Sequence, residues 1–200
     1  MELKYDKIQT TGTDTPLKIV KGHFATNHAH TNYYFDLTTV KSRLSEAGGI
    51  AQALVHMYLY DMIVDTIVCM EGTEVIGTLL AQELTKGVIK PEFNSNSQIV
   101  FKDNYRAMIN GKNVLILTAT VTTGLTINKA IEGVQYYGGI IQGISAVFSA
   151  LENVNGIPIK SVFGLKDVPD YQYSDYRNCP LCKEGKKLDA LINPYGYSKL

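Results

Sequence analysis

The sequence predicts an α/β protein with a central, mostly parallel sheet flanked by helices. Short apolar runs of strand length alternate along the chain with amphipathic segments of helix length. The strand-length runs are apolar throughout, which is typical of parallel strands that are buried on both faces. Right-handed crossovers through the intervening helices would join such strands. With 200 residues, the chain can bury a core without help from disulfides or a metal.

The first elements are a short strand and a helix. A strand over residues 17–20 follows the turn-rich segment 11–16. Over residues 38–58 the apolar residues recur at spacings of three and four, which predicts a helix. They are Val40, Leu44, Ala47, Ala51, Leu54 and Tyr58. Gly48 and Gly49 weigh against an unbroken helix, because each costs on the order of 1 kcal/mol in a helix interior.

The rest of the chain continues the alternation. Amphipathic segments predict helices over residues 75–84 and 125–137. Gly138 and Gly139 end the second helix, because a C-cap favours a residue that tolerates positive φ. Apolar runs predict strands over residues 66–70, 98–102, 113–117, 140–149 and 158–163.

We expect residues 1–200 to form one unit with three parts. The polar N-terminal segment 1–38 precedes an α/β core over residues 39–168. The tyrosine-rich segment 169–200 shows no clear periodicity, so we expect it to form an irregular appendage packed on the core.

Composition excludes several classes of protein. Lys plus Arg and Asp plus Glu both number 19, so net charge provides no general attraction to nucleic acid or an anionic membrane. No run approaches the roughly 18 apolar residues of a membrane span. The N-terminal residues lack the apolar core of a secretory signal, and three cysteines are a poor disulfide framework. We therefore expect a soluble cytoplasmic protein with neither a nucleic-acid nor a membrane partner.

The strongest candidate site follows the strand at residues 113–117. The segment 118–126 contains five threonines and a glycine, and a helix begins within it. Free N–H groups and the positive dipole end at a helix N-terminus bind anions, and Gly124 allows close approach of the backbone. We expect a phosphate to bind at Thr122, Thr123, Gly124, Leu125 and Thr126.

Helix capping and the known nucleotide-binding motifs are the other interpretations of the glycines and threonines in this region. The threonines could simply cap the helix, but five in nine residues exceed what a cap requires. The segment is not a Walker loop, because no lysine follows the glycine. The glycines at 138, 139 and 143 have the wrong spacing for a dinucleotide fingerprint.

A second, weaker junction follows the strand at residues 66–70. There Glu71, Gly72 and Thr73 lead into the next helix. An ordinary strand-to-helix turn is one interpretation, and a second phosphate site is the other. Since ligands bind at the carboxyl ends of parallel strands, two such turns on neighbouring strands suit a ligand with two separated phosphates.

These features resemble a known family. A strand, Thr-Thr-Gly-x-Thr and a helix, preceded about 40 residues earlier by an apolar strand and a glycine turn, resemble the type I phosphoribosyltransferases. Within them, the segments Gly22–Phe24, Asn32–Asp36 and Cys179–Gly185 are most similar to the orotate phosphoribosyltransferases. The likeness runs from about residue 17 to residue 185.

The resemblance implies a fold, a reaction and partners. It implies a small hood formed by the N-terminal segment over the α/β core, and a homodimer. It implies transfer of ribose 5-phosphate from phosphoribosyl pyrophosphate, with Mg²⁺, to a nitrogenous base in nucleotide metabolism, such as pyrimidine biosynthesis.

The resemblance also implies roles for individual residues. Residues 122–126 would hold the 5′-phosphate, and residues 71–73 would line the pyrophosphate side. Lys102 would assist the leaving group. The base pocket would contain Phe24, His28, His30, Tyr33 and Tyr34. Thr118, Ala119 and Thr120 would face the ribose.

The chain departs from this family at the ribose. The family's strand ends in two adjacent acidic residues, and here they are Thr118 and Ala119. A hydrogen bond to a charged group contributes about 1.5–3 kcal/mol, so losing two would weaken ribose binding by about 10²–10⁴-fold. Phe101 also replaces a usual arginine beside Lys102, and the loop over residues 98–111 is short. The alternative function is therefore a catalytically impaired regulatory protein that binds a nucleotide or phosphoribosyl pyrophosphate.

Two short motifs contain residues that ligate metals. Cys179-x-x-Cys182 has the spacing of a zinc knuckle, but a structural zinc needs four ligands and no second cysteine pair exists. His28-x-His30 has no acidic or cysteine partner nearby in the sequence, so it is assigned to pocket lining or to the surface. We therefore expect no metal site formed by the chain itself.

Overall fold

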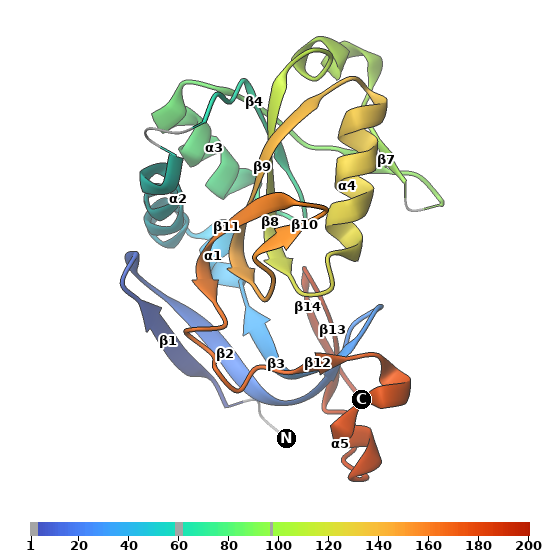
Figure 1. Ribbon diagram of the computed structural model, residues 1–200. Helices are drawn as coiled ribbons and strands as arrows, with labels where there is room; N and C mark the ends of the chain where they lie inside the picture. The colour runs from blue at the N-terminus through green and yellow to red at the C-terminus, as the bar shows by residue number, and fades with distance from the viewer. Residues whose placement is uncertain (1–3, 59–61, 97) are drawn as a thin grey trace.

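The computed structural model describes residues 4–58, 62–96 and 98–200 (Figure 1). Its central sheet has the strand order β10-β11-β9-β8-β4-β5. All neighbours in it are parallel except β10 and β11, so the prediction of a mostly parallel sheet is confirmed. The strands are β4 (Thr66–Cys69), β5 (Gly87–Ile89), β8 (Asn113–Val121), β9 (Ile140–Ser149), β10 (Asn153–Val154) and β11 (Ile157–Gly164).

The register of the central strands brings the two candidate turns together. Cys69, the last residue of β4, pairs with Leu117 of β8. Because the strands are parallel, the turns that follow β4 and β8 lie at the same edge of the sheet. Strand β8 continues four residues beyond the predicted end at 117, so only residues 122–124 separate it from the next helix.

Helices cover both faces of this sheet (Figure 1). One face carries α1 (Thr38–Ser42), α2 (Leu44–Tyr58) and α3 (Glu74–Leu84), and the other carries α4 (Leu125–Tyr136). Each face has its own buried apolar cluster. The predicted helices 75–84 and 125–137 are thus confirmed to within about a residue at either end.

The helix predicted over residues 38–58 is two helices. The break is at Arg43, whose backbone is extended, and Gly48 and Gly49 lie inside α2. A Cβ on Gly49 would lie 2.1 Å from Oγ1 of Thr15. Gly49 is therefore needed for the close approach of α2 to the strand over Thr13–Ala25, which contains Thr15. This packing offsets the low helix propensity of glycine.

A second sheet, which we call the hood sheet, joins the two ends of the chain. Its order is β12-β3-β2-β13-β14, and β1 pairs with β2. The prediction of an irregular C-terminal appendage is wrong, because β13 pairs in parallel with β2 and places Ala190 opposite Phe24. Between β12 and β13 lie η2 (Tyr176–Asn178) and α5 (Pro180–Lys183). The strands are β1 (Asp6–Thr10), β2 (Thr13–Ala25), β3 (His30–Asp36), β12 (Tyr173–Ser174), β13 (Ala190–Asn193) and β14 (Gly196–Lys199).

Aromatic side chains connect the hood sheet to the central sheet. The ring of Phe35 on β3 stacks on that of Phe148 on β9, with centroids 4.0 Å apart. Tyr171 meets both rings at centroid distances of 5.5 and 5.3 Å. Since Phe148 and Tyr171 are buried, this contact is continuous with the core.

The segment between β5 and β8 forms a small ribbon and a turn. Strands β6 (Glu92–Phe93) and β7 (Ile99–Val100) pair with each other, and η1 (Asp103–Met108) follows. The strand predicted over 98–102 is therefore reduced to two residues. Ile99 packs against Gly133 of α4. A Cβ added to Gly133 would lie 2.8 Å from Cβ of Ile99.

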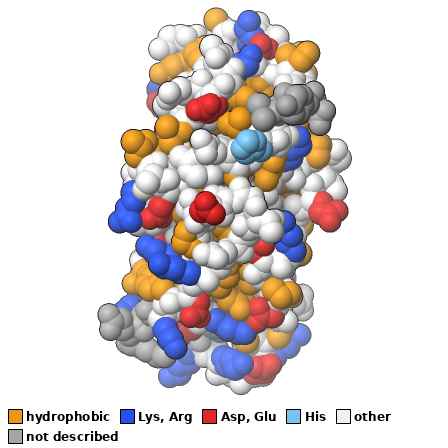
Figure 2. All heavy atoms as spheres, turned by 90° about the vertical axis from the view of Figure 1, so that its left-hand side faces the viewer, with side chains coloured by type: hydrophobic (Ala, Val, Ile, Leu, Met, Phe, Trp, Pro, Cys, Tyr) orange, Lys and Arg blue, Asp and Glu red, His pale blue; other side chains and the backbone are white. Residues whose placement is uncertain are grey.

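The surface agrees with the balanced composition. Acidic and basic side chains are interspersed on the side of the molecule shown in Figure 2. Across the described residues, we find no helix that is both long and apolar enough to cross a membrane.

Candidate functional site

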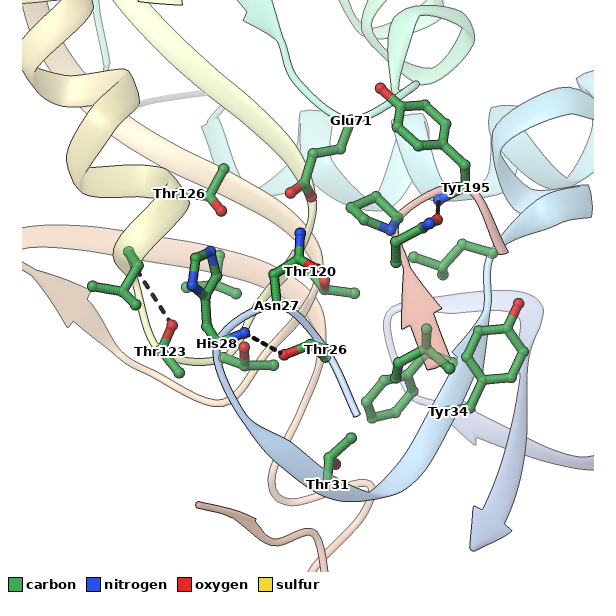
Figure 3. Close-up of a pocket in the computed structure, with 18 of the residues that line it drawn as sticks. Thr26, Asn27, His28, Thr31, Tyr34, Glu71, Thr120, Thr123, Thr126 and Tyr195 are labelled. Carbon is green, nitrogen blue, oxygen red and sulfur yellow. Dashed lines mark hydrogen bonds between the residues drawn. The ribbon is translucent and has the colours of Figure 1, made fainter. Parts of the chain in front are cut away.

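A pocket of about 350 Å³ lies between the hood sheet and the carboxyl edge of the central sheet. Its walls come from the β2–β3 turn, the β8–α4 turn, the β13–β14 turn and Glu71 after β4. Figure 3 shows Asn27 and His28 reaching from the β2–β3 turn toward the β8–α4 turn, with Glu71 and Tyr195 nearby. The pocket therefore lies where ligands bind in open parallel sheets.

The β8–α4 turn presents free backbone donors to this pocket. Residues 120–127 all line it. Gly124 is the N-cap of α4, and within the described chain no side chain caps this helix. The hydroxyl of Thr123 accepts only a long, 3.5 Å hydrogen bond from the Leu125 amide. Because capping does not use the threonines, the amides and hydroxyls of this turn can meet an anion.

The conformation of this turn requires glycine at position 124. Gly124 has a φ of +76°, in the left-handed region that favours glycine. A Cβ there would lie 3.1 Å from Cγ2 of Val154 on β10. The glycine thus allows the sharp turn and close packing against β10 at once.

Glu71 supplies a carboxylate at the end of β8. Its Oε2 accepts a 3.0 Å hydrogen bond from the hydroxyl of Thr118, and the backbone amides of Ala119 and Thr120 also donate to this side chain. Burial raises the pKa of Glu71, and these hydrogen bonds together with Lys41 oppose the rise. Glu71 has a φ of +57° and is the one acidic residue among the described residues that line the pocket. A neighbouring turn therefore brings negative charge to positions where β8 itself has none.

Lys41 fixes the turn that carries Glu71. Its ammonium donates to the carbonyl of Glu71 at 3.1 Å and to the carbonyl of Pro194, and it lies 5.4 Å from the ring centroid of Tyr195. Burial lowers the pKa of Lys41, although neighbouring acidic groups oppose the shift. Sequence reasoning missed Lys41, because a lone lysine on the polar face of a short helix gives no signal. It also missed Lys129, which lines the pocket wall, whereas Lys41 lies behind the turn that carries Glu71.

The other residues of the β4–α3 turn have structural roles in this conformation. Thr73 is fully buried, and its hydroxyl donates to the carbonyls of Met70 and Leu117 at 2.8 and 3.2 Å. Gly72 has a φ of +80° and lies beside the Lys41 ammonium. Of the three residues expected to line the pyrophosphate side, only Glu71 reaches the pocket.

The expected ribose-facing and leaving-group residues are only partly in place. Thr120 lines the pocket, whereas Thr118 and Ala119 are fully buried and are not part of its wall. Lys102 pairs with Glu92 at 3.0 Å, outside the pocket wall.

The expected base-binding residues divide into two groups. His28, Tyr33 and Tyr34 line the pocket. Phe24 is fully buried in a cluster with Tyr34 and Ala190 and does not line the pocket. His30 points away from the pocket, toward the C-terminal segment. Further polar residues in the wall were not singled out from the sequence: Thr26, Asn27, Thr31, Thr38, Asn193.

The C-terminal segment brings the cysteine pair beside two histidines, His23 and His30, while His28 stays in the pocket wall. Nδ1 of His30 lies 3.3 Å from Sγ of Cys182 and 3.1 Å from Nε2 of His23. The side chains of His23, His30, Cys179 and Cys182 form one cluster. The expectation of no metal site counted only cysteines as partners of this pair, and the hood sheet brings two histidines to it.

Comparisons with known proteins agree with this architecture. No protein-family model matches the chain. An orotate phosphoribosyltransferase from Thermus thermophilus is 23% identical over 176 residues, which cover 86% of this chain and 93% of that protein. One from Chlorobium phaeobacteroides is 25% identical over 176 residues, which cover 86% and 88%.

Solved structures share the fold. The orotate phosphoribosyltransferase of Mycobacterium tuberculosis in complex with phosphoribosyl pyrophosphate superposes with a TM-score of 0.53 at 20% identity, over 68% of this chain and 82% of that one. An adenine phosphoribosyltransferase from Thermoanaerobacter pseudethanolicus has a TM-score of 0.53 at 20% identity, over 66% and 88%. The α/β architecture, the two-turn edge of the sheet and the matches along most of the chain lead to one conclusion: this protein is a distant homologue of the type I phosphoribosyltransferases, and most of its matched relatives are orotate phosphoribosyltransferases.

Proposed function

We propose that this protein is an orotate phosphoribosyltransferase-like transferase that moves ribose 5-phosphate from phosphoribosyl pyrophosphate to a nitrogenous base. The uncapped N-terminus of α4, which opens into the pocket at Thr122–Thr126, carries the proposal. Backbone amides and the helix dipole there suit the 5′-phosphate, and Lys129 adds positive charge. The name of the solved relative bound to phosphoribosyl pyrophosphate supports this choice of ligand.

Glu71 is the residue that makes catalysis physically reasonable here. Loss of the pyrophosphate group leaves positive charge developing on the ribosyl carbon. A fixed carboxylate in a partly dry pocket stabilises such charge far better than it would in water. Glu71, held by Thr118 and by the amides of Ala119 and Thr120, would replace the absent acidic pair. The same carboxylate can accept hydrogen bonds from the ribose hydroxyls.

The pyrophosphate side of the site can be assigned on charge. The ammonium of Lys41 lies beside Gly72, so it would lie close to a pyrophosphate bound at that turn. Mg²⁺ usually binds through one or two carboxylates and the phosphates of its substrate, so Glu71 and a bound pyrophosphate form a donor set that fits it. Mg²⁺ bound there would neutralise charge on the leaving pyrophosphate.

The base would lie under the β2–β3 turn. Asn27 and Asn193 offer amide groups, and His28 and Tyr34 offer ring surfaces. Amides can pair with the polar edge of any nucleobase, so this wall fits a nitrogenous base without selecting one. The structural likeness to both orotate and adenine enzymes agrees with that breadth.

A second candidate function keeps the pocket without the reaction. Thr118 and Ala119 carry no charge, and Lys102 is engaged with Glu92 outside the pocket wall. These observations favour a regulatory protein that binds a nucleotide or phosphoribosyl pyrophosphate.

One assay separates the two functions. Purified protein is incubated with phosphoribosyl pyrophosphate, Mg²⁺ and a panel of bases (orotate, uracil, xanthine and adenine), and pyrophosphate release is followed. The transferase predicts release with at least one base. Absence of release with every base, together with calorimetric binding of a nucleoside 5′-monophosphate, would establish the regulatory function instead.

A matched pair of variants tests the phosphate site itself. The double variant Thr122→Ala/Thr123→Ala removes two hydroxyl donors, so we expect its affinity for a nucleoside 5′-monophosphate to fall by about 10-fold or more. Thr78→Ala is the control, because Thr78 is exposed on α3 and its hydroxyl bonds only within that helix. Equal affinities of the two variants would contradict the proposed site.

Two properties stay predictions: the cytoplasmic location expected from the composition, and the homodimer implied by the family resemblance. Light scattering coupled to size exclusion would report the mass in solution, and a mass near 22.1 kDa would contradict the homodimer.

A further inference from the structure

Four side chains from three parts of the chain converge outside the pocket. His23 lies on β2, and His30 is the first residue of β3. Cys179 is the N-cap of α5, and Cys182 lies within that helix. One potential ligand atom from each lies within 4.8 Å of all the others. His23 and Cys179 are buried, Cys182 is exposed, and all three cysteines of the chain are free thiols.

The distances match a tetrahedral metal site. With the usual zinc bond lengths, tetrahedral ligands lie about 3.3 Å apart for two nitrogens and about 3.6 Å apart for nitrogen and sulfur. The Nε2 atom of His23 lies 3.1 Å from Nδ1 of His30, and 3.4 and 3.7 Å from the Sγ atoms of Cys179 and Cys182. Nδ1 of His30 lies 3.3 Å from Sγ of Cys182. The ligand atoms thus surround a space of the size of one metal ion.

The surroundings orient these atoms toward one another. Nδ1 of His23 lies 3.0 Å from the carbonyl oxygen of Lys186. A carbonyl can only accept, so Nδ1 carries the proton and Nε2 presents its lone pair to the cluster. A histidine ligand is commonly held in this way by a hydrogen bond from its other nitrogen.

The sulfur of Cys179 is held similarly by the backbone of α5, because the amides of Cys182 and Leu181 donate hydrogen bonds to it. Such amide donors stabilise a thiolate, the form that binds metals.

We propose that His23, His30, Cys179 and Cys182 bind one structural zinc ion. Two neutral imidazoles and two thiolates balance the charge of Zn²⁺, and Cys₂His₂ is a common closed set for structural zinc. On binding, each thiol loses its proton to solvent and four metal–ligand bonds form, with no change of oxidation state. Because all four positions are taken by protein atoms, the ion would hold structure and not catalyse a reaction.

The position of the ion suggests what it holds. His23 and His30 flank the turn that carries Asn27 and His28 into the pocket, while the cysteines belong to the segment between β12 and β13. Zinc would therefore tie the base of this turn to the C-terminal segment more than 140 residues away in sequence. The link closes a long loop, where a cross-link constrains the unfolded chain most.

The first test measures metal content. The full-length protein is purified in reductant, exposed to zinc, dialysed against metal-free buffer and analysed by mass spectrometry of the elements. We expect about one zinc per chain, as a closed four-ligand site requires. We expect Cys182→Ser and His30→Ala to lose it.

Matched controls use the remaining residues of the same types. Cys69→Ala changes a cysteine inside β4, and His56→Ala changes an exposed histidine on α2. Both should keep the zinc of the unaltered protein. Absence of zinc in the unaltered protein, or equal zinc in Cys182→Ser and Cys69→Ala, would overturn the proposal.

A second measurement does not depend on yield or folding of the variants. Cobalt substituted into the unaltered protein should show thiolate-to-metal charge-transfer absorption, and a chelator should abolish it and lower the melting temperature. Cobalt absorption without thiolate character would contradict the assigned ligands. Neither readout involves phosphoribosyl transfer, so failure of the transferase proposal would leave this one standing, and the reverse also holds.

Discussion

At the scale of single residues, Glu71 decides whether the pocket can do chemistry. Its carboxylate accepts a hydrogen bond from Thr118 on β8 and is the one acidic group among the described residues that line the pocket. We expect Glu71→Gln to lower kcat/KM for phosphoribosyl transfer by about 10–100-fold, the effect of losing one hydrogen bond to a charged group and its electrostatic stabilisation. Unchanged kcat/KM, measured by pyrophosphate release, would show that another group fills this role.

The same substitution should change how stability depends on pH. Because burial raises the pKa of Glu71 in the folded protein above its ordinary value of 4.5, its ionisation opposes folding. Below about pH 4.5 both states are protonated, so Glu71→Gln and the unaltered protein should be equally stable. As the pH rises through the folded pKa, the unaltered protein should become the less stable of the two. Urea unfolding at pH 4 and pH 7.5 measures this, and a gap of opposite sign would show that hydrogen bonds to the carboxylate outweigh burial.

At the scale of elements, the β8–α4 turn depends on one backbone conformation. We expect Gly124→Ala to destabilise the protein by about 1–2 kcal/mol, because alanine is strained at positive φ. The added Cβ also meets Val154, so the turn should shift and its affinity for a nucleoside 5′-monophosphate should fall at least about 10-fold. Gly111→Ala is the matched control, since Gly111 has a φ of +69° with nothing within 4 Å of an added Cβ. We expect the two variants to lose similar stability, but only Gly124→Ala to lose affinity for the nucleoside 5′-monophosphate. Equal affinities of the two variants would contradict this prediction.

At the scale of the whole molecule, the pocket depends on how the hood sheet sits on the central sheet. Phe35→Ala removes a stacked ring from that junction, and we expect a loss of about 3 kcal/mol in the free energy of unfolding. We also expect a higher KM for the base, because the turn that carries Asn27 and His28 into the pocket belongs to the hood sheet, which loses its support. Tyr136→Ala, at a side chain that is 83% exposed, should change stability by no more than about 0.5 kcal/mol. Denaturant unfolding of both variants checks this, and similar losses would mean that the ring contact is energetically unimportant.

Local pattern was enough to predict four of the six central strands (β4, β8, β9 and β11), the helices α3 and α4, and the threonine-rich turn between β8 and α4. A buried parallel strand is recognised by a short apolar run, and an amphipathic helix by the spacing of its apolar residues. Both patterns lie within one short stretch of sequence, as do the threonines at the N-terminus of a helix. Residues 122–126 were therefore found from the chain alone, and the structure places all five in the pocket wall.

What depended on distant segments meeting could not be predicted in this way. Periodicity says nothing of which strand will lie beside β2, so residues 169–200 were expected to be irregular although β13 pairs with it. Likewise, Glu71 reaches Thr118 from 47 positions earlier, and Cys182 meets His30 from 152 positions later. By itself the sequence determined the α/β class and the threonine-rich turn that lines the pocket, because both are local. Only the tertiary structure decided which carboxylate lies at the end of β8 and that two histidines join the cysteine pair. These contacts join segments that share no local signal.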